Sequence, residues 1–404
     1  MSFRLFEPVR LGPLTLKNRT LRAAAFEGMS PGHEVSDALV DYHRAVAQGG
    51  VGMSTVAYAA VEQRGLAFPH QLWLRPQALP GLRRLTDAVH GAGAKVSIQL
   101  GHCGNMAANA KVAGGRALAP SAKFNLYGPV WPKAMSLEEI QRVTRAFGDA
   151  VRLARDAGFD AVEVHAGHGY LISQFLSPST NRRRDAYGGA LEGRMRFMRE
   201  AMAEVRKAAG SDLAVLVKMN TRDGFKGGME LDEAVQVART LEQDGADALI
   251  LSGGFVSRTP MYIMRGPMPT KVMGALMPQW WTRLFVGSFG EWLIPPVPYA
   301  DHYFLEDALI IRKEVKLPLV YVGGVASQAA ADTVLASGFE AIALARALIR
   351  EPDFVNRLQR EEAGSPSRCD HCNYCAARIY TTNMACHLRE PPPEALRRLL
   401  PAGT

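Results

Sequence analysis

Two histidines and a tyrosine stand close together in the run VEVHAGHGYLISQF, as His165, His168 and Tyr170. The apolar run before them predicts a buried strand, and GHGY predicts a loop at its end. Imidazoles three residues apart can ligate a metal with a third ligand, for which Glu163 is suitably placed. They can also donate hydrogen bonds to one substrate oxygen, or bond only to the backbone. The residues by themselves leave these three interpretations open.

Glycines and an arginine follow two other candidate strands. One strand ends in VYVGGVAS, with Gly323 and Gly324, and another ends in IALARAL, with Arg346. Backbone amides of glycines together with a cation are a frequent phosphate site at the carboxyl ends of parallel strands. The alternative is a tight turn and an arginine in a salt bridge. The positions favour a phosphate-bearing ligand.

Gln99 and Lys218 lie near the ends of two further strands. Gln99, in SIQLGHCGN, faces inward by alternation, and Lys218 lies in LVKMN. A lysine at such a place can form a Schiff base, or it can be a positive charge beside an anionic ring. The sequence does not separate these two roles.

Four of the five cysteines lie near the carboxyl terminus, in CDHCNYCAARIYTTNMAC. Cys369, Cys372, Cys375 and Cys386 have the spacing C-x2-C-x2-C-x10-C, which suits an iron–sulfur cluster or zinc held by four thiolates. His371 and His387 are substitute ligands. Free or structural thiols are the third interpretation, and five cysteines are too few for a disulfide framework.

Eight short apolar runs alternate with helical patterns and predict the elements that hold these residues. The expected strands cover 20–25, 51–58, 95–100, 161–166, 213–220, 248–254, 317–324 and 340–346. Such alternation predicts an α/β fold, a (β/α)8 TIM barrel whose active site lies at the carboxyl ends of the strands. A doubly wound sheet would place GxGxxG after the first strand, and RAAAFEGMS has none.

Two segments interrupt the alternation. Residues 255–305, after the sixth strand, are rich in Met, Trp and Pro, and are either a lid or substrate wall on the catalytic face or a surface excursion with its own small core. The second is the cysteine-rich tail. We therefore expect a barrel over residues 1–362 and a C-terminal extension over 363–404.

Composition narrows the setting. The net charge of +8 is spread thinly over 404 residues, which argues against nucleic acid as a partner. The apolar runs are far shorter than the roughly 20 residues of a membrane span. The amino terminus, MSFRLFEPVRLG, lacks the pattern of a secretory signal. We expect a cytoplasmic protein that forms a homo-oligomer and binds no membrane.

The run HAGHGYLISQFLSPSTNRRRDAYGGALEGRMRF at 165–197 resembles the signature of the old yellow enzyme family of flavin-dependent ene-reductases. FEPVRLGPLTLKNR at 6–19, the SIQLGH segment and the closing VGG and ARALIREPDF runs resemble the same family. The resemblance implies an FMN-containing barrel that oxidises NAD(P)H and reduces activated C=C bonds, such as those of enones, in a ping-pong cycle.

The resemblance also assigns individual residues. It places Ala24 and Ala25 beneath the flavin, Gln99 at its pyrimidine edge, Lys218 near flavin N1 and C2=O, Gly323, Gly324 and Arg346 at the phosphate, His165 and His168 at the carbonyl oxygen of the substrate, and Tyr170 as proton donor. Two departures stand out. Ala25, Phe26 and Glu27 occupy the region where many members have a Cys or Thr facing the flavin, and Lys218 stands where Arg is common.

The tail resembles the [4Fe–4S] motif of the 2,4-dienoyl-CoA reductase and trimethylamine dehydrogenase branch, with a slightly shorter last spacing. In that branch the cluster passes electrons to a second flavin domain, which we do not expect in this chain. Other functions stay open: dehydrogenation or demethylation of an amine or steroid-like substrate, a flavin-free aldolase or isomerase using Lys218 as a Schiff base, and a metal- or partner-binding protein acting through the tail.

Overall fold

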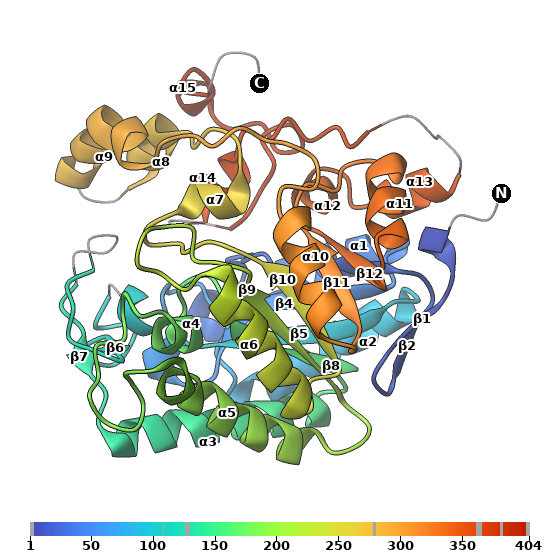
Figure 1. Cartoon of the computed structure of the whole chain (residues 1–404). Helices are drawn as coiled ribbons and strands as arrows, with labels where there is room; N and C mark the ends of the chain where they lie inside the picture. The colour runs from blue at the N-terminus through green and yellow to red at the C-terminus, as the bar shows by residue number, and fades with distance from the viewer. Residues whose placement is uncertain are drawn as a thin grey trace.

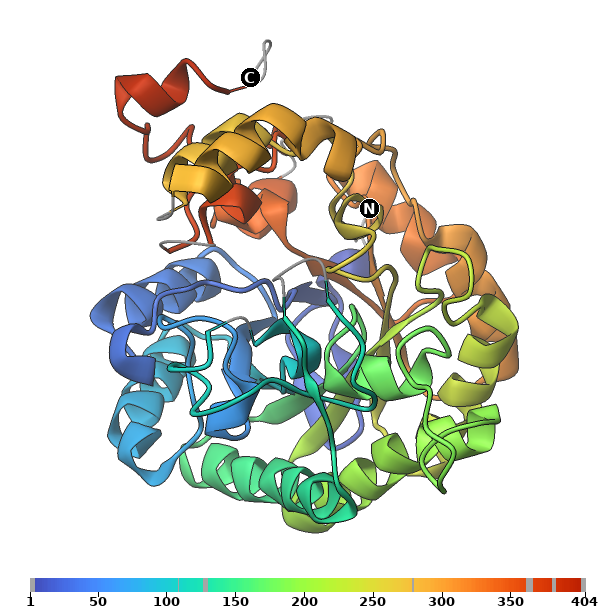
Figure 2. The ribbon, with the colours of Figure 1, turned by 90° about the vertical axis from the view of Figure 1, so that its left-hand side faces the viewer.

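A closed barrel of eight parallel strands forms the centre of the computed structural model, which describes residues 4–107, 109–125, 130–277, 280–360, 366–379 and 383–400 (Figures 1 and 2). The strands are β3 (Thr20–Arg22), β4 (Met53–Ala60), β5 (Lys95–Gly101), β8 (Ala161–Ala166), β9 (Ala214–Asn220), β10 (Ala248–Ser252), β11 (Leu319–Val322) and β12 (Ala341–Leu344). Each overlaps one of the eight predicted runs. The predicted (β/α)8 barrel is therefore confirmed.

Pairing of the last strand with the first closes the barrel. Ile342 lies opposite Thr20, and Leu344 lies opposite Arg22. Before β3 the chain forms an antiparallel hairpin of β1 (Val9–Leu11) and β2 (Leu14–Leu16). Its buried side chains pack against Ala161 and other residues that begin the barrel strands. The hairpin thus covers the amino ends of the strands, so the opposite end carries the site.

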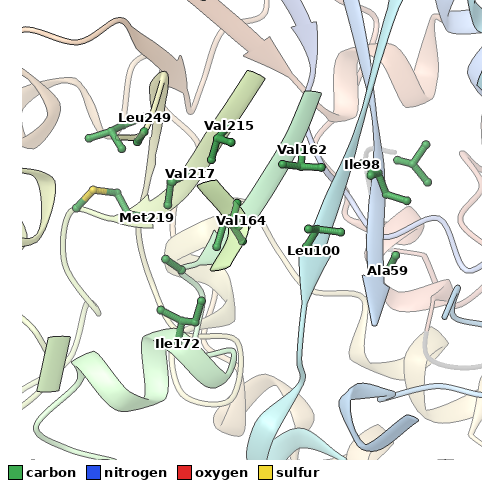
Figure 3. Packing of buried hydrophobic residues seen from close by; sticks show 14 of the residues in the cluster. Ala59, Ile98, Leu100, Val162, Val164, Ile172, Val215, Val217, Met219 and Leu249 are labelled. Carbon is green, nitrogen blue, oxygen red and sulfur yellow. The ribbon is translucent and has the colours of Figure 1, made fainter. Parts of the chain in front are cut away.

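Helices surround the barrel and pack on its outward-facing residues. The longer ones are α1 (Asp37–Gln48), α2 (Leu79–Gly91), α3 (Leu137–Asp156), α5 (Leu191–Ala209), α6 (Leu231–Gln243), α10 (Leu305–Glu314) and α11 (Gln328–Ala336). Figure 3 shows side chains of this outer layer, among them Val162, Val215 and Leu249. A capping box formed by Ser136 and Glu139 starts α3.

Shorter elements connect these units. They are α4 (Leu171–Leu176), α12 (Arg346–Arg350), α13 (Phe354–Gln359), β6 (Leu118–Ala119), β7 (Lys133–Ala134), and the 3-10 turns Arg4–Phe6, Pro31–His33, Gln63–Gly65, Pro76–Ala78 and Gly104–Met106. No described helix is both long and apolar enough to cross a membrane.

The two segments that interrupt the alternation pack against each other. The insertion contains α7 (Pro260–Met264), α8 (Thr270–Leu276) and α9 (Trp280–Leu293), and the tail contains α14 (Tyr374–Arg378) and α15 (Glu394–Arg397) (Figure 1). Met261, Met268 and Met273 of the insertion form one buried cluster with Ala377 of the tail. They share a small core outside the barrel. The domain boundary predicted between residues 362 and 363 lies outside the described residues.

Helix α9 turns an aromatic face to the solvent. Trp280, Trp292 and Leu284 are exposed by 76%, 81% and 66%, and Trp281, Phe285 and Phe289 by more than half. The other face of α9 packs on α8, where Gly274 comes so close to the α9 backbone that a side chain would meet the Arg283 carbonyl at 3.0 Å.

Candidate active site

His165 and His168 lie side by side where β8 ends. Their ring centroids are 5.2 Å apart, and the rings are nearly perpendicular. The backbone N–H of Gly167 donates to His165 Nδ1 over 3.4 Å, so that Nε2 carries the proton that a ligand would meet. The structure therefore brings together the two histidines that the sequence singled out.

Side chains of the next two strands hold His168 in place. Its backbone N–H donates to Asn220 Oδ1 of β9 over 2.9 Å, and its Nε2 lies 2.7 Å from Ser252 Oγ of β10. The residue has a left-handed backbone, with φ of 58°. Asn220 and Ser252 end their strands, but only the fold shows that they contact this loop.

Tyr170 lies beside the histidines and against a second tyrosine. Its ring centroid is 4.4 Å from that of His165 and 4.7 Å from that of Tyr58 in β4. Burial raises the pKa of Tyr58 well above 10, and the neighbouring Tyr170 phenol adds to the effect. Tyr58 therefore stays neutral. Sequence reasoning missed Tyr58, because a tyrosine inside a predicted strand gives no functional signal of its own.

A buried ion pair lies beneath the histidines. Glu163 Oε1 accepts hydrogen bonds from Lys218 Nζ over 2.8 Å and from Gln99 Nε2 over 2.6 Å. The three residues are 1–2% exposed. The structure thus brings Gln99 and Lys218 together, through a carboxylate that the sequence suggested only as a metal ligand.

This arrangement bears on the alternatives for the histidines and the lysine. Glu163 is hydrogen-bonded to Lys218 and Gln99, and its oxygens do not lie close enough to the nitrogens of both histidines to share a metal ion with them. Within the described ranges, the one group of three ligand atoms near enough to share a metal ion is Asp370, Cys372 and His387. The Lys218 nitrogen that a Schiff base would need is hydrogen-bonded to a carboxylate.

Both imidazoles are neutral at physiological pH. Burial, with the charge of Lys218 second, lowers the pKa of His168 to about 3. Burial also lowers the pKa of His165 well below 6.5, and His168 and Lys218 contribute to that shift. The pair therefore offers N–H donors without carrying a charge of its own.

Gly323, Gly324 and Arg346 line one hollow between the ends of β11 and β12. Both glycines have positive φ, and a Cβ on Gly324 would lie 2.6 Å from the Ala300 carbonyl oxygen. Arg346 Nη1 donates to Asn373 Oδ1 over 2.8 Å and to the Arg265 carbonyl over 3.0 Å. A guanidinium with five N–H groups keeps further donors for an anion in the hollow. The donor set fits a phosphate.

The loop after β3 is anchored by a second buried ion pair. Arg22 lies 2.6 Å from Glu27, and Arg22 Nη2 donates to the Ala25 carbonyl over 2.7 Å. Glu27 also accepts from the Ala57 backbone N–H over 3.1 Å. Ala24 and Ala25, between these partners, are half-buried. Glu27 thus fixes the loop that the sequence assigned to the flavin.

The four clustered cysteines line one cavity, close to Arg346. None forms a disulfide. Burial raises the pKa of Cys375 to about 12, and the nearby Cys369 and Cys386 thiols contribute, while Arg346 opposes the rise. His387 is hydrogen-bonded to Asp370 over 2.7 Å, and His371 stacks on Tyr299 at 3.6 Å. Both imidazoles have protein partners, which leaves four thiols around the cavity.

Comparison with known proteins decides the family. Residues 4–257 match the model of the NADH:flavin oxidoreductase / NADH oxidase family. The chain belongs to this family. It is therefore an FMN-dependent oxidoreductase that uses NAD(P)H, and the resemblance to old yellow enzymes is confirmed. Membership in a flavin-dependent family contradicts the alternative of a flavin-free aldolase or isomerase that uses Lys218 as a Schiff base.

Individual relatives differ in length. The chain is 42% identical over 382 residues to 4,4'-dithiodibutanoate disulfide reductase of Rhodococcus erythropolis, covering 93% of each protein. It is 30% identical over 373 residues to an NADH oxidase of Thermoanaerobacter brockii, covering 91% of this chain but 52% of that enzyme, so it spans about half of the relative's length. The old yellow enzyme homologue of Zymomonas mobilis superposes with a TM-score of 0.70 at 25% identity, covering 91% and 95% of the two chains.

The Glu163–Lys218 pair gives a stability prediction. Glu163→Gln leaves a buried ammonium without its counter-charge, so we expect the free energy of unfolding to fall by about 3–5 kcal/mol in urea titrations. Combining it with Lys218→Met removes the buried charge and should restore most of the loss. Glu394→Gln is the control, because its pair with Arg398 is exposed, and about 1 kcal/mol or less is expected. A loss in Glu163→Gln no larger than in the control would contradict the role of the pair.

The histidine pair gives a pH prediction. The folded-state pKa of each imidazole lies below the ordinary value near 6.5, so below that pH the unfolded chain binds more protons. The contribution of each histidine to stability is complete above about pH 6.5 and is lost as the pH falls below that value, by about 1.4 kcal/mol per pH unit, and for His168 the loss continues to about pH 3. A double variant, His165→Asn with His168→Asn, should show a shallower loss between pH 6.5 and 4 in urea titrations. An unchanged slope would show that the pair is not the source.

Proposed function

We propose that this oxidoreductase reduces activated C=C bonds of enone-like acceptors. The observation that carries the proposal is the convergence of two neutral imidazoles and a phenol at the end of β8, where the ring centroid of His165 lies 5.2 Å from that of His168 and 4.4 Å from that of Tyr170. Such an acceptor has a carbonyl oxygen that gains negative charge during reduction and a carbon that needs a proton. The three side chains match those two needs.

FMN, when bound, supplies the hydride that passes from NAD(P)H to the acceptor. The residues that would hold it lie at successive strand ends. Ala24 and Ala25 would lie beneath its ring, Gln99 and Lys218 would contact its pyrimidine edge, and Gly323, Gly324 and Arg346 would bind its phosphate. Small side chains, a fixed amide with a cation, and a glycine-lined hollow are the groups that such a cofactor requires.

His165 and His168 act as hydrogen-bond donors to the acceptor oxygen. Because both are uncharged, they stabilise developing negative charge without holding an anion before the reaction. His168 is fixed by Asn220 and Ser252, so no reorganisation is needed as charge develops. Tyr170, against His165, is placed to give a proton to the carbon next to the carbonyl.

Reduction of an organic disulfide is a second candidate, favoured by the relative that matches over 93% of both lengths. A hydride would reduce one sulfur as the S–S bond breaks, and Tyr170 would protonate the departing thiolate, which yields two thiols. Cys103, which packs near Tyr170, is buried, and burial raises the pKa of its thiol strongly. It therefore supplies no thiolate for disulfide exchange.

Tyr170→Phe tests the proton-donor role. Reoxidation of the reduced enzyme by an enone should slow by about 100-fold or more, because the proton source is removed, while reduction of the enzyme by NAD(P)H should keep its rate. Stopped-flow absorbance of the flavin follows both half-reactions. Tyr187→Phe is the control, because its hydroxyl bonds Glu200 on a surface helix. Equal losses in both half-reactions would refute the role.

We further propose that Cys369, Cys372, Cys375 and Cys386 hold a [4Fe–4S] cluster. The support is that all four thiols line one cavity, while His371 and His387 have partners of their own. Burial raises the pKa of Cys375, so loss of its proton is unfavourable in the free protein. A metal centre that binds the thiolates supplies the attraction that compensates for this cost.

Metal analysis tests the cluster. Protein purified without oxygen should contain about four iron atoms and as much acid-labile sulfide per chain. Cys375→Ser should lose the iron, whereas Cys103→Ser, which changes a cysteine outside the tail, should keep it. A content of one zinc ion per chain, without iron, would contradict the cluster and support a zinc site. Absence of both metals would contradict any metal site and support a structural role for the thiols.

A further inference from the structure

A pocket beside the His168 loop carries three cations and no carboxylate. Its lining contains Lys123, Lys226 and Arg258 together with Phe124, Phe225 and Phe255, and no acidic residue. Lysines and arginines on the surface of this protein are otherwise often paired, as Arg222 is with Asp307 over 2.7 Å. The absence of an acidic residue from this lining therefore needs an explanation.

The pocket is joined directly to the catalytic loop. Phe255 pairs with His168 in a parallel β-bridge, and the Val256 N–H donates to the His168 carbonyl over 3.0 Å. Val256 also packs in one cluster with Tyr170. A ligand that reaches the histidines can therefore extend into this pocket.

Lys123 and Arg258 are held together by one serine. Lys123 Nζ donates to the Ser179 carbonyl over 3.0 Å, and Arg258 Nη1 donates to Ser179 Oγ over 2.8 Å. The guanidinium also lies over the Phe225 ring, 4.5 Å from its centroid. Two like charges are thus fixed beside each other by neutral groups.

This pair has no counter-charge in the part of the chain that the structure describes. Among the described residues, neither Lys123 nor Arg258 forms a salt bridge, and the same holds for their neighbours Arg182 and Lys226. Burial and the nearby Arg258 and Arg182 lower the pKa of Lys123, which is the effect of uncompensated positive charge. An anion bound between them would remove this repulsion.

We propose that Lys123 and Arg258 form an anion subsite, which binds a carboxylate or phosphate of the ligand remote from the reacting atoms. Phe124, Phe225 and Phe255 line the same pocket and give it apolar walls. The ligand would then have a reducible group at the histidines, an apolar body and an anionic end. This inference rests on the proposed function, because the position of the reducible group comes from it.

Binding to the oxidised holoenzyme tests the subsite without turnover. The probe is 4-(4-carboxyphenyl)but-3-en-2-one, an enone with a remote carboxylate, and its methyl ester is the matched neutral probe. Each dissociation constant is read from the change in flavin absorbance on titration. Lys123→Met and Arg258→Met should each raise the dissociation constant of the acid about tenfold and leave that of the ester unchanged. Lys123→Arg should retain the affinity, and Lys316→Ala, at an exposed lysine elsewhere, should have no effect.

A second arm identifies the source of the anion. NADH and NADPH carry phosphates, whereas 1-benzyl-1,4-dihydronicotinamide donates hydride without one, so the three are compared in reduction of the flavin. If the Lys123→Met and Arg258→Met variants bind only the acid enone more weakly, the subsite binds an anionic acceptor. If they bind only NADH and NADPH more weakly, the subsite binds a phosphate of the nucleotide. Equal losses for acid and ester, or no loss for any anionic ligand, would overturn the subsite. Failure of the wild-type enzyme to reduce either enone would instead count against the proposed function, because the binding titrations stand without it.

Discussion

The ion pair between Glu163 and Lys218 is the interaction on which the catalytic end of the barrel depends. It joins β8 to β9 inside the barrel, and Gln99 joins β5 to the same carboxylate oxygen. A single buried ammonium would be costly in this place, and the carboxylate makes it tolerable. After burial, the positive charge of Lys218 also helps to keep the neighbouring imidazoles unprotonated. The buried acid therefore fixes the geometry of the site, and burial together with the lysine that it holds keeps the imidazoles neutral.

The insertion and the tail form a second, smaller body of structure on the catalytic end. The two segments bury apolar residues against each other as well as against the barrel. The shared core is the cluster of methionines around Ala377. The tail thereby reaches Arg346 through Asn373, which also donates to the Arg265 and Pro267 carbonyls of the insertion. These contacts link a long loop of the barrel to the chain that follows it.

The barrel could be predicted from the sequence because each strand is a short apolar run between a helix stop and a loop, a signal that depends on local residues. The pairing of the histidines with Tyr170 was also local, since all three lie within six residues. What could not be predicted were contacts between strand ends distant in sequence. The sequence offers Glu163 only as a third ligand in one of three alternatives, whereas the structure shows it as the partner of Lys218. Sequence reasoning also misses Tyr58, Asn220 and Ser252. Their roles arise only when barrel closure fixes which strands are neighbours.

Arg346 faces two places at once. It lines the glycine hollow between β11 and β12, and it also lines the cavity of the four thiols. If a ligand in the hollow changes the binding free energy of a ligand among the thiols, the ligand among the thiols must change the binding free energy in the hollow by the same amount. If the hollow binds the flavin phosphate and the thiols bind the cluster that we propose, filling of one site that promotes filling of the other implies that loss of either ligand weakens binding of the other to the same degree. The order in which they are loaded does not alter the total.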